Sequence, residues 1–261
     1  MDFAHSADPA VQRQLDRLTL LSPGRDILGL NRIATLLARL GDPQLQLPPV
    51  FHVAGTNGKG STCAFLRAML EAAGKRVHVY SSPHLVRFNE RIRLAGRLID
   101  DALLAPLLEE VLAVAGDLQA SFFEVTTAAA FLAFARVPAD ACVIEVGLGG
   151  RLDATNVIPA PVVCGIAQLG IDHQAFLGDN AEQIAAEKAG IARAGVPLVT
   201  LAYSTSVAES VRAVAAAAGA PVASLGESWT IDEHPFTYRD AFGAVTLSAP
   251  GLAGAHQHLD A

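Results

Sequence analysis

The segment FHVAGTNGKGST, residues 51–62, constrains the chain more than any other stretch. A short apolar run ends there in a glycine-rich turn that carries Lys59, and a segment with helical periodicity follows. Glycines let backbone N–H groups approach an anion, the start of a helix adds partial positive charge, and Lys59 adds a full charge. The order of strand, glycine-rich turn and helix therefore predicts a nucleotide phosphate site.

The match to the generic phosphate-loop pattern is incomplete. Val53 stands where Gly-x-x-x-x-Gly-Lys-Ser/Thr has its first glycine, and Gly60 separates Lys59 from Ser61. A plain turn would also account for Gly-Thr-Asn-Gly. The generic motif alone leaves both interpretations open.

The pattern after residue 50 predicts the fold class. Short apolar runs alternate with helical patterns, which is typical of an α/β fold with a mostly parallel sheet covered by helices on both faces. With the glycine-rich turn, this is a P-loop-type sheet. We expect a helical segment over residues 1–48 and a small antiparallel β appendage at 228–248. The expected strands are 50–54, 76–80, 140–146, 162–169, 197–202 and 221–225, and the expected helices are 9–21, 32–40, 61–73, 101–115, 124–135, 181–192 and 206–218.

Composition narrows the partners and the compartment. A formal charge of −7 provides no basic surface for nucleic acid or an anionic membrane, so we expect neither partner. The chain has no uncharged apolar run long enough for a membrane span and no secretory signal pattern at its start. Cys63, Cys142 and Cys164 fit neither a metal site nor a disulfide framework, which favours small buried residues in a reducing compartment. We expect a cytoplasmic protein and treat it as a monomer.

In parallel sheets, ligands bind beyond the carboxyl ends of the strands, so the loops after residues 54, 80, 146 and 169 should carry the chemistry. Ser82 follows one strand, and its hydroxyl suits Mg²⁺, although serine is also an ordinary turn residue. Glu145 ends an apolar strand, where a carboxylate is costly unless it is paired or bound to a metal. We interpret Glu145 as a magnesium ligand, with capping of the next turn as the alternative.

Two further residues of this region allow more than one role. His173 follows another predicted strand at the same carboxyl edge of the sheet, called the rim below, and could complete a metal site there. A structural histidine is the commoner role, however, and nitrogen is an unusual ligand for Mg²⁺. Lys188 lies on a predicted helix, where spacing alone indicates a solvated surface charge. Arg151 and Asp153, in the glycine-rich segment after Glu145, could be only a local ion pair.

Seven short segments occur in a fixed order along the chain. They are GTNGKGS at 55–61, SSPHL at 81–85, FNERI at 88–92, FFEVTT at 122–127, EVGLGGRLDATN at 145–156, DH at 172–173 and EKAGI at 187–191. In this order they resemble the folylpolyglutamate synthase/dihydrofolate synthase family of the Mur ligase superfamily. The resemblance spans about residues 26–261, and the string at 145–156 is its most specific part.

This resemblance implies an ATP-dependent ligase with two Mg²⁺ ions. Ser82 and Glu145 match the ligands of the first ion, and Glu145 with His173 those of the second. Lys188 matches a lysine that is carbamylated in the family, which would turn a cation into an anionic oxygen donor near the metals. The implied catalytic residues are Lys59, Glu145, His173 and Lys188. The residues implied to bind the ATP phosphates are Thr56, Asn57, Gly58, Lys59, Gly60 and Ser61.

The resemblance also implies a site for a pterin-bearing substrate. A flat pterin would stack on the aromatic face of Phe123. The alternative for Phe122 and Phe123 is core packing, and we expect at least one of them to pack that way. The matching residues are Leu28, Gly29, Ser121, Phe122, Phe123, Glu124, Leu152, Asp153 and Ala154.

The implied reaction has two stages. A substrate carboxylate attacks the γ-phosphate of ATP, which gives an acyl phosphate and ADP, and the amine of L-glutamate then displaces phosphate to form an amide. Lys59 and the two Mg²⁺ ions would stabilise charge on the transferring group. The implied partners are ATP, dihydropteroate, reduced folates and L-glutamate, as for a bifunctional synthase. The alternatives are another Mur-type amino-acid ligase and an ATP- or pterin-binding fragment without turnover.

Family members are longer and carry a second Rossmann-like domain. We therefore expect one ATP-binding domain over residues 1–250, with 251–261 as the start of a linker or helix toward a C-terminal glutamate-ligase domain that the chain lacks. Asp260 stands where the family has an asparagine that contacts ATP. A carboxylate there could not donate the same hydrogen bond.

Overall fold

The computed structural model describes residues 4–21, 28–233, 235–248, 250–252, 254 and 257. Asp260 and most of the predicted linker at 251–261 lie outside the described residues. The strands of the main sheet are β1 Val50–Ala54, β2 Val77–Tyr80, β3 Ile92–Leu94, β4 Arg97–Leu98, β5 Ala141–Glu145, β6 Val163–Ile166, β7 Leu198–Thr200 and β8 Val222–Ser224.

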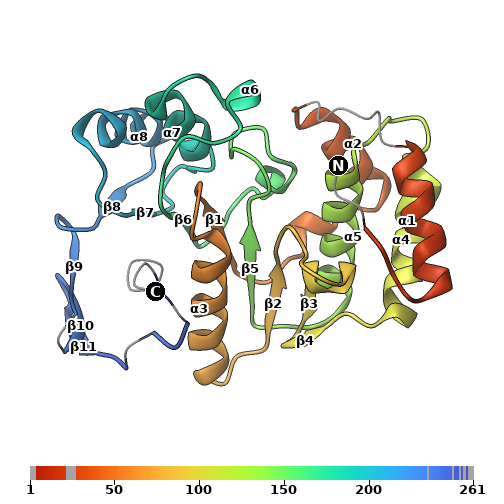
Figure 1. Cartoon of the computed structure of the whole chain (residues 1–261), viewed down its shortest axis with the longest axis horizontal. Coiled ribbons are helices and arrows are strands. Elements are labelled where there is room, and N and C mark those ends of the chain that lie inside the picture. The colour runs from red at the N-terminus through yellow and green to blue at the C-terminus, as the bar shows by residue number, and fades with distance from the viewer. Residues whose placement is uncertain are drawn as a thin grey trace.

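These strands form one eight-stranded sheet in the order β4-β3-β2-β5-β1-β6-β7-β8 (Figure 1). The strands from β2 to β8 in that order pair in parallel, whereas β3 and β4 add an antiparallel edge. The predicted P-loop-type, mostly parallel sheet is confirmed. The helices are α1 Pro9–Leu21, α2 Asn31–Arg39, α3 Lys59–Ala72, α4 Asp101–Ala115, α5 Phe122–Arg136, α6 Gln174–Leu177, α7 Ala181–Ala189 and α8 Thr205–Ala218, and the 3₁₀ turns are η1 Pro43–Leu45, η2 Phe88–Arg91 and η3 Ala154–Val157.

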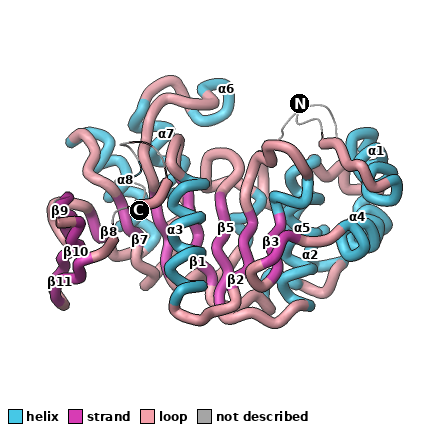
Figure 2. The backbone as a smooth tube through the Cα atoms, turned by 60° about the horizontal axis from the view of Figure 1, so that its bottom comes forward, coloured by secondary structure: helices cyan, strands magenta, loops and turns pink. Residues whose placement is uncertain are grey.

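Helices cover both faces of the sheet. Successive strand residues point to opposite faces, and the strands are apolar on both, so both faces need to be buried. On one face α3 buries Cys63 against Val53 and Val143. On the other face α5 packs against one half of the sheet, around Tyr80 and Ile144, together with α1, α2 and α4. The helices α7 and α8 pack against the β6 and β7 half of that face. Figures 1 and 2 show α3 apart from these two groups.

Local sequence signals fix several helix starts. The Asp100 side chain accepts a hydrogen bond from Leu103 N at the start of α4. Ser121 and Glu124 form a reciprocal capping box at the start of α5. Gly58 caps α3 in the left-handed conformation with φ +80°, which glycine adopts without steric cost. These signals fix the starts of α3 and α5, the two main helices of the site.

The small antiparallel appendage is also confirmed. Its strands are β9 Trp229–Glu233, β10 Phe236–Asp240 and β11 Gly243–Thr246. It lies at the β8 end of the molecule (Figure 2). The rings of Trp229 and Tyr238 stack with their centroids 6.1 Å apart, which gives this sheet its own aromatic contact.

Some features of the structure were not predicted from the sequence, among them a short hairpin and a short helix. The β3–β4 hairpin is short and half exposed, so it lacks the alternating apolar pattern that identifies a strand. The helix α6 has only 4 residues. The strand predicted at 162–169 ends at Ile166, because the residues after it leave the sheet to form part of the site.

Burial of the cysteines agrees with the sequence analysis. Cys63, Cys142 and Cys164 are all buried and free, as predicted. Within the described part of the chain, no helix combines the length and the apolar character that crossing a membrane requires.

Candidate functional site

Four neighbouring parallel strands bring the predicted loops to one edge of the sheet. The order β2-β5-β1-β6 places the chain after Tyr80, Glu145, Ala54 and Ile166 side by side at their carboxyl ends. This is where ligands bind in open α/β sheets. The predicted grouping of these loops is therefore confirmed.

The glycine-rich loop folds its lysine back over itself. Lys59 Nζ lies 3.1 Å from the carbonyl oxygen of Gly55 and 3.3 Å from that of Thr56. Lys59 is also the first residue of α3, a helix whose first N–H groups have no partner within the helix. An ammonium group and the positive end of a helix thus lie together, which is the charge arrangement that an anion requires.

The neighbouring rim loop holds this glycine-rich loop in place. The backbone N–H groups of Thr56 and Asn57 donate to the carbonyl oxygen of Gln168 at 2.8 and 3.2 Å. The Thr56 hydroxyl lies 3.1 Å from both the N and the O of Gly170. Thr56 and Asn57 therefore use backbone N–H groups to join two loops, and residues 59–61 keep the free first-turn N–H groups of α3.

Glu145 lies beside the start of α3. Its side chain is buried, and its Oε2 accepts a hydrogen bond from Ser82 N at 3.2 Å. A Cβ atom added to Gly60 would lie 3.9 Å from its Oε1, so the first turn of α3 borders the carboxylate. Burial raises the pKa of Glu145 to about 7, while the Ser82 N–H group and Lys59 act in the opposite direction.

Lys188 is buried, so its interpretation as a solvated surface charge is wrong. Only 1% of the residue is exposed. Its Nζ donates to the carbonyl oxygen of Gly55 at 3.0 Å and to Asp172 Oδ2 at 3.1 Å. Burial lowers the pKa of Lys188, and Asp172 opposes that shift. Asp172 is a site residue that the sequence analysis missed, although it directly precedes His173 in the rim loop.

His173 occupies a different environment. It is exposed, adopts the left-handed conformation with φ +44° and precedes α6. Its side chain makes no hydrogen bond or ion pair with a residue that the structure describes, so the geometry does not join it to Glu145. In the described ranges there is likewise no group of three or more His, Cys, Asp and Glu side chains that could hold a metal ion.

The donor set fits one Mg²⁺ better than two. The Ser82 hydroxyl and the Glu145 carboxylate are hard oxygen donors, which Mg²⁺ prefers. Lys188, by contrast, is an ammonium group with no lone pair to offer. A second ion at His173 and Lys188 would need a chemical change of the lysine and movement of the histidine.

Two of the residues predicted to hold the substrate, Ser121 and Glu124, form the N-terminal capping box of α5. Ser121 N donates to Glu124 Oε2 at 2.7 Å, and Glu124 N donates to the Ser121 hydroxyl at 3.2 Å. Arg32 Nε forms an ion pair with the same Glu124 oxygen at 3.1 Å. The second oxygen, Glu124 Oε1, is buried without a hydrogen-bond partner among the described residues. Leu28 and Gly29, both partly exposed, lead into α2.

Phe122 and Phe123 both pack against the hydrophobic core, which confirms the packing expectation for the pair. Phe122 meets Phe88 edge-on, with ring centroids 6.0 Å apart. Phe123 lies 5.9 Å from Tyr80, and a Cβ atom added to Gly147 would come within 2.3 Å of its ring. Phe123 therefore borders the glycine loop as well as the core.

Arg151 and Asp153 do not pair, so the interpretation of these two residues as a local ion pair is wrong. Arg151 instead pairs with Glu187 at 2.9 Å, because its side chain extends toward α7. Asp153 is buried and accepts hydrogen bonds from the backbone N–H groups of Gly147 and Leu148. Its neighbours Leu152 and Ala154 are partly exposed and buried respectively.

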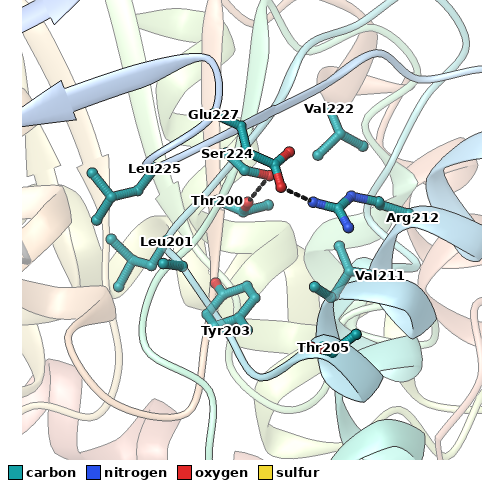
Figure 3. A pocket seen from close by; sticks show the side chains of 12 residues that line it. Thr200, Leu201, Tyr203, Thr205, Val211, Arg212, Val222, Ser224, Leu225 and Glu227 are labelled. Atoms are coloured by element: carbon teal, nitrogen blue, oxygen red, sulfur yellow. Dashed lines mark hydrogen bonds and ion pairs between the residues drawn. The ribbon is translucent and has the colours of Figure 1, made fainter.

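A hollow lies beyond the carboxyl ends of β7 and β8, on the same edge of the sheet as the site loops (Figure 3). Its volume is about 300 Å³, and none of the predicted site residues lines it. The Tyr203 hydroxyl, part of its lining, donates to the carbonyl oxygens of Ile166 and Ala167 at the end of β6. The Thr200 hydroxyl donates to Ser224 Oγ at 3.0 Å, and Arg212 pairs with Glu227 across its opening. Its polar groups are thus largely satisfied within the chain.

Comparison with known proteins gives consistent results, although no family model matches the chain. The chain is 39% identical over 220 residues to the dihydrofolate synthase/folylpolyglutamate synthase of Escherichia coli, covering 84% of the chain and 51% of that protein. It is 42% identical over 247 residues to the Bacillus subtilis protein of the same name, covering 89% of the chain and 57% of that protein. The chain thus spans about half the length of these relatives.

Solved structures show the same fold. E. coli FolC in complex with DHPP and ADP superposes with a TM-score of 0.89 at 36% identity, covering 97% of the chain and 61% of FolC. A bifunctional folylpolyglutamate synthase/dihydrofolate synthase with Mn, AMPPNP and L-glutamate bound gives a TM-score of 0.86 at 36% identity, covering 98% and 62%.

Proposed function

Because the chain belongs to the folylpolyglutamate synthase/dihydrofolate synthase family over the part of those proteins that it spans, we propose that it carries the ATP site of a bifunctional ligase. The reaction joins L-glutamate to dihydropteroate and to reduced folates at the expense of ATP. The observation that carries this proposal is the position of Lys59 at the start of α3, beside the buried carboxylate of Glu145.

The ATP phosphates bind at the glycine-rich loop. The N–H groups of the first turn of α3 and the Lys59 ammonium group neutralise the phosphate charge, and Lys59 leaves the Gly55 and Thr56 carbonyl oxygens to do so. ADP and AMPPNP in the solved relatives support a nucleotide as the ligand.

Ser82 and Glu145 would hold one Mg²⁺ ion. The ion supplies positive charge that stabilises the transferring phosphoryl group. Mn bound in a solved relative supports a divalent cation as a ligand. Glu145 is held in place by the Ser82 N–H group, which keeps one of its oxygens oriented before the ion binds.

A second ion, bound with His173 and a carbamylated Lys188, remains a proposal. The Lys188 amine would add to CO₂ with loss of one proton, and burial favours the neutral amine that this addition requires. The reaction would replace the ion pair with Asp172 by an anionic oxygen donor. A ¹³C NMR carbamate signal in labelled bicarbonate, present in the native chain and absent from Lys188→Met, tests this proposal. Absence of the signal from both chains contradicts it.

The acid substrate lies along Phe123 and the glycine loop. Its carboxylate attacks the γ-phosphate of ATP, so that a new C–O–P bond forms as the bond to ADP breaks. The amine of L-glutamate then attacks the acyl carbon, and phosphate leaves as the amide forms. Lys59 stabilises negative charge in the first stage, and no side-chain nucleophile is needed.

ADP release tests the function. The chain is incubated with ATP and Mg²⁺, and dihydropteroate and L-glutamate are added separately and together. Release that requires both substrates supports the ligase. Nucleotide binding without release under any combination overturns turnover by this chain, and release with a cell-wall precursor acid in place of dihydropteroate supports another Mur-type ligase. We further propose a cytoplasmic location and a monomer; the three free cysteines support the former.

A further inference from the structure

We propose that His52 and Thr155 are positioning residues for the acid substrate, and that they act through Asp153 on the glycine loop at residues 147–150. The inference rests on the proposed function, because it concerns the substrate bound beside Phe123. It assigns a role in binding to two residues of the core that lie behind the predicted site.

The chain of hydrogen bonds begins in the centre of the sheet. His52 lies on β1, is 1% exposed and places Nε2 2.8 Å from Thr155 Oγ1. The Thr155 hydroxyl in turn donates to Asp153 Oδ1. Since a hydroxyl has one proton to donate, Thr155 accepts from His52, which is therefore protonated on Nε2. Burial lowers the pKa of His52 to about 3, so the ring stays neutral and keeps this single direction.

Asp153 links these side chains to the backbone of the glycine loop. Its Oδ2 accepts from Gly147 N at 3.0 Å and from Leu148 N at 2.8 Å, while its Oδ1 accepts from Thr155 N at 2.9 Å. With the Thr155 hydroxyl, the carboxylate receives four donors. It is 2% exposed. We therefore infer that Asp153 fixes the loop from behind.

The glycine loop that Asp153 fixes packs against Phe123 at one end and against the backbone of Lys188 at the other. At one end, Gly147 leaves no room for a side chain beside the Phe123 ring. At the other end, a Cβ atom on Gly150 would lie 2.6 Å from the backbone oxygen of Lys188. A small shift of the loop therefore changes the surface against which Phe123 and the substrate pack.

The hydrogen-bonded side chains of His52 and Thr155 are not needed to fill the core. Replacement of both partners of a buried hydrogen bond by apolar groups of the same shape is often nearly neutral for stability. His52 and Thr155 are both buried, and Arg193 lies close enough to His52 to lower its pKa further. The feature that apolar residues could not reproduce is the fixed orientation of the Asp153 carboxylate toward Gly147 and Leu148.

The test compares Thr155→Val, which has nearly the same shape but no hydroxyl, with Thr155→Ser, which keeps the hydroxyl. Dihydropteroate and Mg²⁺–AMPPNP are titrated into the full chain by calorimetry. Thr155→Val should bind dihydropteroate about tenfold more weakly, because a hydrogen bond to a charged acceptor is lost, with nucleotide affinity unchanged. Thr155→Ser should restore dihydropteroate affinity to within about twofold of the native value.

A matched control removes another buried threonine hydroxyl. Thr200→Val breaks the 3.0 Å bond between β7 and Ser224 on β8, shown in Figure 3, and should change neither affinity. His52→Leu removes the first donor and provides a second variant if Thr155→Val does not fold. It should weaken dihydropteroate binding about threefold, because the bond lost is between neutral groups.

The outcomes separate this inference from the function on which it rests. Native chain that binds dihydropteroate, with Thr155→Val binding it equally well, overturns the inference alone. Equal loss of both affinities in folded Thr155→Val shows a general structural role and also overturns it. Native chain that binds no dihydropteroate overturns the substrate proposal itself. Amide exchange gives a ligand-free check: Gly147 and Leu148 should exchange faster in Thr155→Val, whereas unchanged rates contradict the mechanism.

Discussion

Replacement of Glu145 by glutamine should stabilise the metal-free chain above neutral pH. The side chain is buried beside α3, and its only hydrogen bond to a described residue comes from Ser82 N. Glutamine has the same shape and can still accept that bond through its carbonyl oxygen. The substitution therefore removes the buried charge and little else.

The size and sign of the effect follow from the pKa. Burial raises the pKa of Glu145 from 4.5 to about 7, so between these values the folded chain holds a proton that the unfolded chain has lost. Stability that this group contributes is present below pH 4.5 and falls as the pH rises toward 7. The difference amounts to about 3 kcal/mol at full ionisation. Glutamine does not ionise, so the free energy of unfolding of Glu145→Gln should not fall in this way.

Urea unfolding from about pH 5 to about pH 9 measures the difference. The free energy of unfolding of Glu145→Gln minus that of the native chain should be about 1 kcal/mol at the acidic end and rise to about 3 kcal/mol above neutrality. Mg²⁺ with AMPPNP should stabilise the native chain and not the variant. Glu209→Gln, at an exposed site on α8, is the control and should show no such rise. A difference that stays flat with pH refutes the argument.

Three further substitutions test the packing around the site. Gly147→Ala should displace the Phe123 ring, which lies 2.3 Å from the added Cβ, and weaken dihydropteroate binding at least about tenfold in calorimetry; unchanged affinity contradicts the contact. Gly150→Ala meets the backbone oxygen of Lys188 at 2.6 Å, which cannot move aside cheaply, so the urea midpoint should fall by the equivalent of about 1–3 kcal/mol, and a native-like midpoint argues against the packing. Ser121→Ala removes the cap of α5 and should cost about 1 kcal/mol in the same assay; no loss would show that the cap is redundant.

The sequence predicted the architecture where apolar periodicity is strong. The bounds of β1 and α4, at Val50–Ala54 and Asp101–Ala115, agree with the predicted ranges residue for residue. A buried parallel strand is a continuous apolar run, and α4 has a clear capping residue before it. The β3–β4 hairpin has neither property, since its residues are half exposed and its strands are very short.

The site was predictable only in part, because burial of a polar side chain depends on the tertiary structure. Glu145 was identified because a carboxylate ends an apolar strand. Lys188 sits in a helix of mixed composition, so its burial and its pairing with Asp172 become visible only when α7 packs behind the glycine-rich loop. The spacing of Arg151 and Asp153 suggested a pair, whereas the chain turns between them and sends the two side chains in different directions.

Nucleotide binding tests the central claim most directly. Titration of the chain with Mg²⁺–AMPPNP should show one site, and Lys59→Ala should weaken binding by at least about tenfold, because a charge-assisted contact to phosphate is removed. Lys75→Ala, at an exposed position three residues beyond the far end of α3, should bind as the native chain does. No binding by the native chain, or equal affinity of native chain and Lys59→Ala, would contradict the assignment of the glycine-rich loop as the phosphate site.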